Sequence, residues 1–243
     1  MGRPTGMSPP RIVALDLARA VALGAMAVYH FFFDLEMFGF VAPGTALSQP
    51  LRGLAICTAA SFLALAGISL VLAQGSGLRV IPFVRRLGMI AAAALAITLG
   101  SYVWAPDIYI YFGILHCIAL CSLLGLALLW LPGWALALGA AGAFVLPDNV
   151  TLSAPALLWT GLVAPIRPAL DYVPLFPWSA AFLLGMAVGK FGRQAGLWAR
   201  LADVQVPALV EWFAWPGRHS LAIYLIHQPV LIAMIWLASQ VIA

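Results

Sequence analysis

The sequence predicts an all-α membrane protein, a polytopic bundle of about seven transmembrane helices. Of its 243 residues, 64% are hydrophobic and only 8% are charged, whereas soluble domains are nearer half apolar and a quarter charged. The mean hydropathy is +1.05, and the apolar residues gather in runs long enough to cross a bilayer. Because no stretch is polar enough to form a separate soluble domain, we expect a single domain over residues 1–243.

Seven hydrophobic segments can be counted along the chain, and each is expected to form a helix. They cover residues 12–33, 53–73, 86–104, 109–131, 133–147, 176–191 and 220–241. The fifth is short for a full crossing, but the Leu-Pro-Gly at 131–133 predicts the tight turn that returns the chain to the bilayer after the fourth. Residues 154–164 are apolar but are broken by Pro155 and Pro165, so we expect a re-entrant or interfacial segment there.

Basic residues predict the orientation of these helices, because loops rich in Lys and Arg stay on the cytoplasmic side. They precede the first segment and lie between the second and third and between the sixth and seventh: Arg3, Arg11, Arg79, Arg85, Arg86, Lys190, Arg193, Arg200 and Arg218. Only Arg52 and Arg167 are basic in the opposite loops. We therefore expect the N-terminus inside and the C-terminus outside. The net charge of +4 is explained by this topology, and no nucleic-acid partner is expected.

Four ionisable residues lie on one face of the first segment. At ~100° per residue, Asp16, Arg19, His30 and Asp34 point within an arc of about 60°. At ~1.5 Å per residue, Asp16 and Asp34 lie ~27 Å apart along the axis, close to the thickness of the hydrocarbon core. Charged groups in a spanning helix face a protein interior or a watery cavity. This face is therefore the strongest indication of a functional site.

His30 and Asp34 are one helical turn apart, so the carboxylate can accept a hydrogen bond from the imidazole and raise its basicity. A histidine held in this way is the usual group for removing a proton from an attacking hydroxyl or amine. A capping Asp beside an interfacial His would leave the same pattern. Near the inner face, Asp16 and Arg19 are expected to form an ion pair, and Arg19 is also a candidate for an anion pocket.

Two later segments carry further histidines. His116 lies about 10 Å into the fourth segment, at a depth similar to that of His30, so it either shares a cavity with His30 or serves as hydrogen-bonded scaffold. Four polar residues of the last segment project to one face: Ser220, Tyr224, His227 and Gln228.

Arginines near the inner face are candidate ligands for a phosphorylated cytoplasmic molecule. Arg85 and Arg86 precede the third segment, and Arg218 precedes the seventh, whose positive helix end faces the same side. Arginine at inner loop ends is also an ordinary topology signal, so both interpretations stand. The cysteines and histidines show no zinc-ligand spacing, and no metal is expected.

Asp171 and Trp178 flank an aromatic, proline-rich stretch beside the sixth segment. Interfacial anchoring explains the aromatic rings. The two prolines between them would also hold both flanking side chains rigidly at the outer mouth of a cavity. There they are candidate substrate-binding residues.

At these positions the chain resembles a known family. The run from Arg11 through Asp16 to Arg19, followed by Tyr29-His30 and Phe33-Asp34-Leu35, is similar to the opening of a bacterial domain of unknown function now joined to the catalytic domain of heparan-alpha-glucosaminide N-acetyltransferase. Further matches, in the same order, are residues 111–116, 171–178, 217–221 and 224–229. The last of these also resembles the wider transmembrane acyltransferases that decorate bacterial polysaccharides.

The resemblance implies a multi-pass acyltransferase of the bacterial inner membrane. It would move an acetyl or similar acyl group from acetyl-CoA to a hydroxyl or amine of a sugar or other cell-envelope acceptor. His30 would be the catalytic histidine, with Asp34 as its orienter and His116 as a further candidate. The residues expected to bind CoA are Arg19, Arg85, Arg86, Arg218 and His227, and those expected to bind the acceptor are Asp171 and Trp178. The expected partners are the lipid bilayer and the acceptor, and a homo-oligomer is compatible with the sequence.

Other functions fit the same residues. A proton-coupled transporter would use the ionisable face as a proton relay. A haem-binding electron carrier would take its axial ligands from His30, His116 and His227. An accessory protein, in which the polar groups only hold helices together, is a further alternative.

Overall fold

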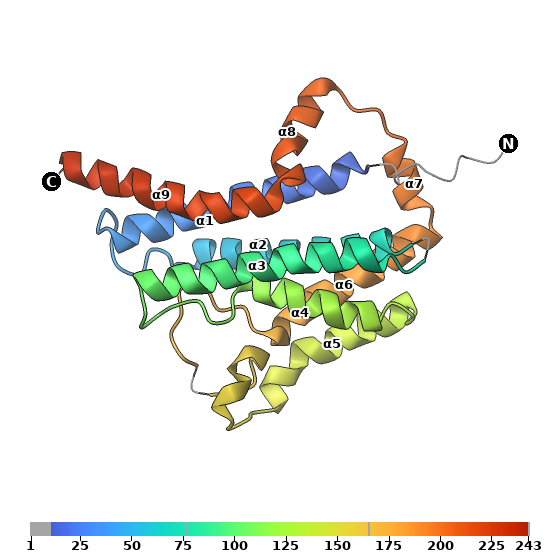
Figure 1. Cartoon of the computed structure of the whole chain (residues 1–243), viewed down its shortest axis with the longest axis horizontal. Helices are drawn as coiled ribbons and strands as arrows, with labels where there is room; N and C mark the ends of the chain where they lie inside the picture. Colours follow the sequence, from blue (N-terminus) through green and yellow to red (C-terminus); the bar gives the residue numbers. More distant parts are fainter. Residues whose placement is uncertain (1–10, 76, 165, 243) are drawn as a thin grey trace.

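The computed structural model describes residues 11–75, 77–164 and 166–242, which form a bundle of helices (Figure 1). Seven helices correspond in order to the seven predicted segments: α1 (Val13–Met37), α2 (Gln49–Ala73), α3 (Val80–Trp104), α4 (Ile114–Ala127), α5 (Gly133–Asn149), α6 (Leu175–Gln194) and α9 (Ser220–Ile242). Three short helices accompany them: η1 (Pro155–Thr160), α7 (Leu197–Ala202) and α8 (Ala208–Arg218). Arg3, which was used to predict the orientation, lies outside the described residues.

Within the described residues, α1, α2, α3, α6 and α9 are long and apolar enough to cross a bilayer. The prediction of an all-helical, multi-pass membrane protein is therefore confirmed. The other two corresponding helices are shorter, with 14 residues in α4 and 17 in α5. At 1.5 Å per residue they span about 21 and 26 Å, less than the hydrocarbon core of about 30 Å. The structure thus supports five full crossings where the sequence predicted about seven.

The fourth predicted segment, 109–131, is shortened at both ends. At its start the chain is not helical, because Phe112 instead forms a bridge with Tyr172 in the loop before α6. Gly113 then provides the N-cap of α4. At its end the chain turns, with the Leu131 N–H donating to the Leu128 carbonyl oxygen. Apolar character alone could not reveal the pairing that holds residues 109–113 extended.

Two regions predicted as inner loops are helical. Because α3 begins at Val80, Arg85 and Arg86 lie on its second turn rather than in a loop. The region between the sixth and seventh segments contains α7 and α8. α8 approaches α1 so closely that a Cβ at Gly217 would overlap the carbonyl oxygen of Asp16. This approach places Arg218 beside the ionisable face of α1.

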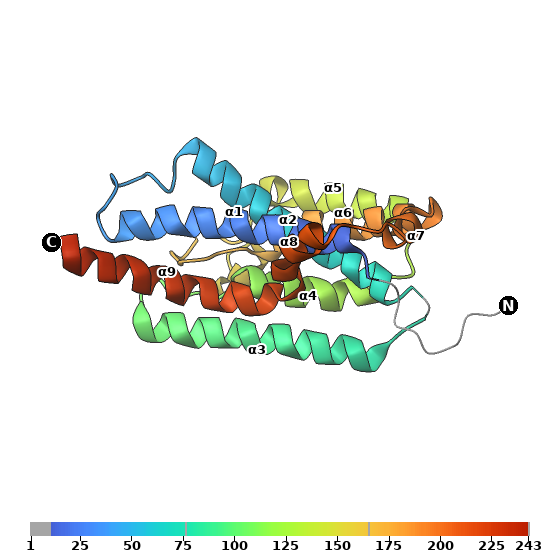
Figure 2. The same cartoon turned by 90° about the horizontal axis from the view of Figure 1, so that it is seen from above.

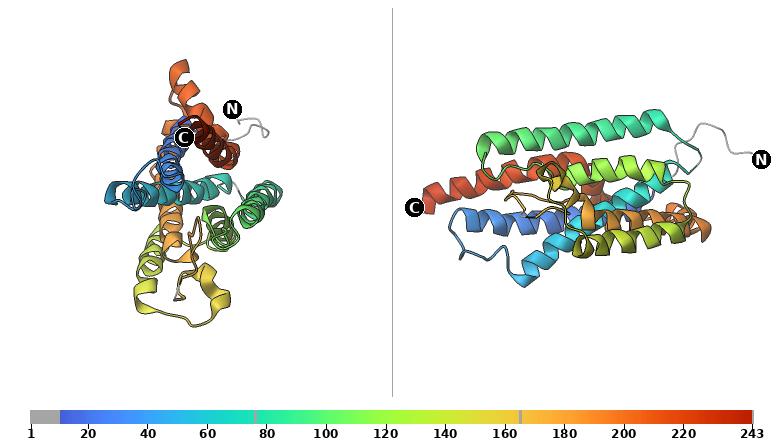
Figure 3. Two further views of the ribbon diagram at one scale, coloured as in Figure 1. Left: turned by 90° about the vertical axis from the view of Figure 1, so that its left-hand side faces the viewer. Right: turned by 90° about the horizontal axis from the view of Figure 1, so that it is seen from below.

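The core of the bundle lies around α2 and α6. Glycines let the two helices meet closely: a Cβ at Gly185 would overlap the backbone of Ala64, and a Cβ at Gly67 would overlap the carbonyl oxygen of Phe182. In the end-on view of Figure 3, α5 covers the far side of α6, and α1 covers the opposite side of α2. α8 and α9 pack on α1. α4 lies beside the core, and α3 forms the outer edge of the bundle.

Successive long helices run in opposite directions, so the connections gather at two ends of the bundle (Figure 2). One end, here called the basic end, carries the start of α1, the α2–α3 connection and α7. The opposite end carries the α1–α2 and α3–α4 connections and the end of α9 (Figure 1). This alternation places the basic loops together, as the charge pattern predicted.

Candidate active site

The ionisable face of α1 turns toward the protein interior, as predicted. Asp16 and Asp34, near the two ends of the helix, are 4% and 0% exposed. Arg19 and His30, which lie between them, are half-buried. Buried charges in a membrane protein need partners or a watery cavity, so the contacts of these four residues define what the site can do.

Asp16 is surrounded by arginines. Its Oδ1 accepts a hydrogen bond of 2.8 Å from Arg19, and its Oδ2 accepts one of 2.8 Å from Arg11. Arg218 at the end of α8 approaches the same Oδ2 to 3.7 Å. Arg19 also donates to the Ser69 hydroxyl on α2 at 2.6 Å. The predicted ion pair between Asp16 and Arg19 is therefore present, and it joins α1 to α8 and α2.

Asp34 pairs with α9 rather than with His30, which corrects the expected hydrogen bond between the two. The Gln228 amide donates to the Asp34 Oδ1 at 2.7 Å. The His30 Nδ1 and the Asp34 Oδ2 are both buried and have no hydrogen-bond partner among the described residues. The one-turn spacing permits the expected contact, but α9 offers a competing amide donor that the spacing could not reveal. In this structure Asp34 ties α1 to α9 and does not orient the imidazole.

His227 lies beside His30. The centroids of the two rings are 5.0 Å apart. The His227 Nδ1 is 2.6 Å from the Tyr224 carbonyl oxygen, to which it donates when protonated, and its Nε2 is buried without a partner among the described residues. His227 therefore belongs to the surroundings of the candidate base His30, and the prediction that it binds the donor together with the arginines is not supported by its position.

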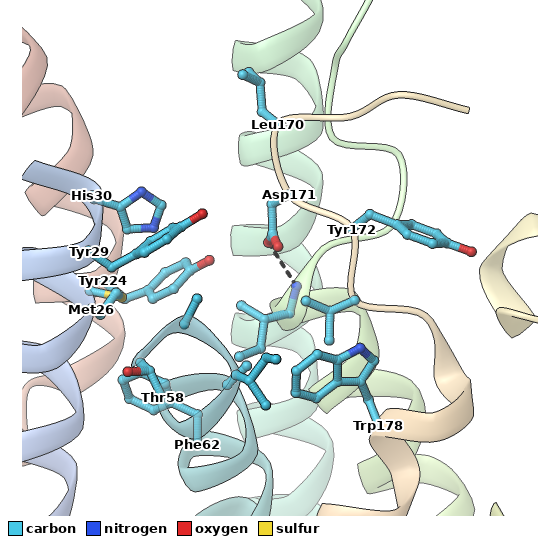
Figure 4. A pocket seen from close by; sticks show the side chains of 15 residues that line it. Met26, Tyr29, His30, Thr58, Phe62, Leu170, Asp171, Tyr172, Trp178 and Tyr224 are labelled. Atoms are coloured by element: carbon cyan, nitrogen blue, oxygen red, sulfur yellow. Dashed lines mark hydrogen bonds between the residues drawn. The ribbon is translucent and has the colours of Figure 1, made fainter. Parts of the chain in front are cut away.

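A central cavity of about 240 Å³ lies between α1, α2, α9 and the loop before α6. Figure 4 shows it from close by, with His30, Tyr29 and Tyr224 on one side and Asp171 and Trp178 on the other. The hydroxyl groups of both tyrosines point into the cavity on the side of Asp171. Three predicted residues, His30, Asp171 and Trp178, are thus brought together from segments far apart in the sequence.

Asp171 is held against the start of α4. Its Oδ2 accepts a hydrogen bond of 3.0 Å from the Ile114 N–H, at the helix end that favours negative charge. Gly113 leaves the space for this contact, because a Cβ there would overlap the same oxygen. Burial raises the pKa of Asp171 to about 6, and the hydrogen bond from Ile114 opposes that rise. The carboxyl group can therefore gain or lose a proton near neutral pH.

A second cavity of about 480 Å³, here called the arginine cavity, lies toward the basic end. Arg19, Arg86 and Arg218 line it, together with the first turn of α9. It shares three lining residues with the central cavity: Phe62, Ile114 and Tyr224. Three of the predicted phosphate-binding arginines therefore meet, whereas Arg85 does not line this cavity.

A third cavity of about 550 Å³, here called the lateral cavity, lies between α1, α3 and α9. It shares four lining residues with the central cavity: His30, Leu170, Asp171 and Tyr224. His227 and Gln228 also line it. The three cavities therefore adjoin one another, and Tyr224 contributes to the walls of all three.

His116 lies in a different cavity from His30, so of its two interpretations the structure favours the hydrogen-bonded scaffold over the shared cavity. Its Nε2 is 3.2 Å from the Thr98 hydroxyl, and its Nδ1 accepts a hydrogen bond of 3.2 Å from the Gly113 N–H. The cavity around it lies between α3, α4 and η1. The similar depths of His116 and His30 along their helices do not indicate the direction in which α4 turns the His116 side chain. As a result, His30, His116 and His227 do not converge on one site.

Four residues of the site were not among the sequence-predicted candidates. One of them, Tyr224, lines all three cavities. Gln228 was noted only as part of a polar helix face, although it is the partner of Asp34. Tyr29 and Thr58 line the central cavity, and the Thr58 hydroxyl is buried without a partner among the described residues. A hydroxyl group inside an apolar run was the available signal for Thr58.

Comparison with known proteins gives one match. The family model described as heparan-alpha-glucosaminide N-acetyltransferase, catalytic, matches residues 11–229. No curated protein and no solved structure matches the chain significantly. The matched range includes the ionisable face of α1, the inner arginines, Asp171 and the polar face of α9. The chain therefore belongs to the family of the heparan-alpha-glucosaminide N-acetyltransferase catalytic domain.

Proposed function

We propose that this protein is an acyltransferase of the bacterial inner membrane that moves an acetyl group from acetyl-CoA to a hydroxyl or amine of a sugar or other cell-envelope acceptor. Family membership indicates acetyl transfer in a multi-pass membrane protein. The observation that supports the donor and the mechanism is the arrangement of the cavities. A cavity lined by three arginines adjoins the cavity that contains His30.

The arginine cavity suits the phosphate groups of CoA. Arginine presents planar donors that match phosphate oxygens, and the positive end of α9 adds to the field. Asp16 already faces Arg19 and Arg218, so Arg86 is the arginine least committed to the protein itself. Arg19 and His30 lie about 16 Å apart along α1 at 1.5 Å per residue. The thioester at the end of the long pantetheine arm would cross that span past Tyr224.

His30 would act as the general base in a direct transfer. It takes the proton of the acceptor hydroxyl, and the oxygen attacks the thioester carbonyl carbon. The carbon–sulfur bond then breaks, the CoA thiolate leaves, and the imidazolium returns its proton to the thiolate sulfur. The hydroxyl groups of Tyr224 and Tyr29 are placed to stabilise the negative charge that develops on the carbonyl oxygen. Asp171 and Trp178 would hold the acceptor on the opposite side of the cavity.

The orientation is part of the same proposal. The basic end would face the cytoplasm, where acetyl-CoA is made, because it carries the connections rich in arginine. The opposite end would face outward, where cell-envelope acceptors are found. The adjoining cavities would then let an activated cytoplasmic acyl group reach an acceptor beyond the membrane.

The test is acetyl transfer by the purified protein in lipid nanodiscs. We expect radiolabelled acetyl-CoA to transfer its acetyl group to a mixture of bacterial envelope sugars, and His30→Gln to abolish the transfer while its thermal unfolding stays like that of the wild type. His116→Gln is the matched control, because it removes a histidine of similar depth from a different cavity. Equal turnover by wild type and His30→Gln would rule out the mechanism.

A further inference from the structure

The lateral cavity opens between two helices that scarcely touch each other. α3 and α9 flank it, and their few mutual contacts leave most of their facing surfaces apart. Both helices are candidate membrane spans. α9 packs mainly on α1, and nearly all of its apolar window stays unburied. The gap between α3 and α9 therefore opens sideways, toward lipid, in the part of the bundle where Met37 and Trp104 end α1 and α3.

The walls of this cavity are divided by polarity. Where it adjoins the central cavity, polar groups line it, and the His30 Nδ1, the His227 Nε2 and the Gln228 Oε1 are buried without partners among the described residues. Buried polar atoms are normally hydrogen-bonded, so this end is suited to a ligand that offers hydroxyl groups. Toward the bilayer, the walls are apolar and include Phe33, Trp104 and Ile232.

Small residues keep the apolar part of the cavity open. Five residues of α3 line this cavity, and two of them, Ala96 and Gly100, are small. A Cβ built at Gly100 would meet no atom within 4 Å. The space beside Gly100 is therefore not filled by the protein. This apolar part of the lateral cavity, here called the apolar channel, offers room for an apolar chain.

We propose that the acceptor is a membrane amphiphile, a sugar joined to an apolar chain. Its hydroxyl group would lie at His30, and its chain would lie between α3 and α9 and continue into the lipid. This inference rests on the proposed acetyl transfer and names its substrate class. A soluble sugar would require only the central cavity and would leave the apolar channel without a function.

The apolar chain of the acceptor does not change the chemistry of acetyl transfer. The acceptor loses a hydroxyl proton to His30 and gains the acetyl group as an ester, and CoA leaves as its thiol after taking up that proton. The apolar chain positions the acceptor, because it holds the sugar at a fixed depth in the membrane while the sugar hydroxyl group contacts the thioester. Burial of each methylene group favours binding, so the gain should appear in kcat/KM.

The experiment compares methyl glucoside with dodecyl glucoside as acceptors in nanodiscs. We expect kcat/KM to be at least about tenfold higher for dodecyl glucoside. Gly100→Phe fills the channel and should bring the ratio of the two values down to that produced by membrane partitioning alone. Gly142→Phe on α5 is the matched control, because a Cβ there also meets open space and Gly142 lines none of the three cavities. It should keep the wild-type ratio.

A second measurement reads binding without turnover. A dodecyl glucoside that carries a photoreactive group in its chain should label the segment around Trp104 and Ile232 in the wild type and in Gly142→Phe, but not in Gly100→Phe. Equal labelling of all three proteins, or a ratio that Gly100→Phe leaves unchanged, would overturn the assignment of the acceptor. Absence of acetyl transfer to every acceptor, together with specific labelling, would instead overturn the proposed reaction and keep the amphiphile site.

Discussion

Arg86 gives the sharpest test of how the donor binds. Among the described residues it forms no ion pair, whereas Arg19 and Arg218 both face Asp16. Arg86→Gln therefore removes a charge from the arginine cavity without breaking a contact that holds the helices together. Its neighbour Arg85 is on the same helical turn but lies outside the cavity, so Arg85→Gln is a control of the same chemistry and the same depth.

The size of the effect follows from the kind of contact that is lost. A hydrogen bond to a charged group contributes about 1.5–3 kcal/mol, and each 1.4 kcal/mol is about a tenfold change in affinity. We therefore expect Arg86→Gln to raise the KM for acetyl-CoA by about 10- to 150-fold. The kcat should change little, because the phosphates lie far from the reacting carbonyl.

The assay is acetyl transfer at several donor concentrations, with acetyl-CoA and with S-acetylpantetheine, a thioester donor that lacks the nucleotide and its phosphates. Arg86→Gln should leave the KM for S-acetylpantetheine unchanged, and Arg85→Gln should leave both values unchanged. The reasoning is refuted if Arg85→Gln raises the KM for acetyl-CoA as much as Arg86→Gln does. It is also refuted if Arg86→Gln raises the KM for acetyl-CoA and the KM for S-acetylpantetheine by the same factor.

Three further predictions concern the walls of the site. Gly113→Ala should displace the Asp171 carboxylate from α4, because a Cβ at position 113 would overlap it. The rate of acetyl transfer should then fall by about 10- to 100-fold. A wild-type rate in a folded Gly113→Ala variant would contradict this prediction. The raised pKa of Asp171, about 6 against an ordinary 3.8, means that the folded state binds its proton more tightly than the unfolded state. Stability should therefore fall as pH rises from about 4 to 6, and the Tm of Asp171→Asn relative to wild type should increase between pH 4 and pH 7; a constant difference would show that the carboxyl group is not desolvated. Gln228→Leu removes the hydrogen bond that the Asp34 carboxylate accepts from α9 and should destabilise the protein by about 1–3 kcal/mol. Gln240→Leu, at an exposed position of α9, should have little effect on thermal unfolding.

The positions of the seven main helices along the sequence were predictable, because apolar runs and arginine-rich loops follow directly from the physics of the bilayer. The inward direction of Asp16 and Asp34 was predictable for the same reason, since charges avoid lipid. The sequence also predicted His30 as a catalytic residue and Asp171 and Trp178 as substrate-binding residues, and the structure brings all three to one cavity.

Contacts between helices were not predictable from one sequence. Spacing along α1 allowed a hydrogen bond from His30 to Asp34, but Asp34 accepts its hydrogen bond from Gln228 on α9 instead. Equal depth suggested that His116 joins His30, but the rotation of α4 turns it toward Thr98. The arginines near the inner face looked equivalent, and only the packing of α3 separates Arg86 from Arg85. Each difference depends on which helix lies opposite, information that periodicity does not contain.

The central claim is that a donor bound at the basic end serves an acceptor on the other side of the membrane. The direct measurement uses sealed proteoliposomes of known orientation, with acetyl-CoA only in the compartment that faces the basic end and dodecyl glucoside added only to the opposite side. We predict that acetylated glucoside forms at a rate that depends on His30. Acetylation only when the donor is added on the same side as the glucoside would contradict the account.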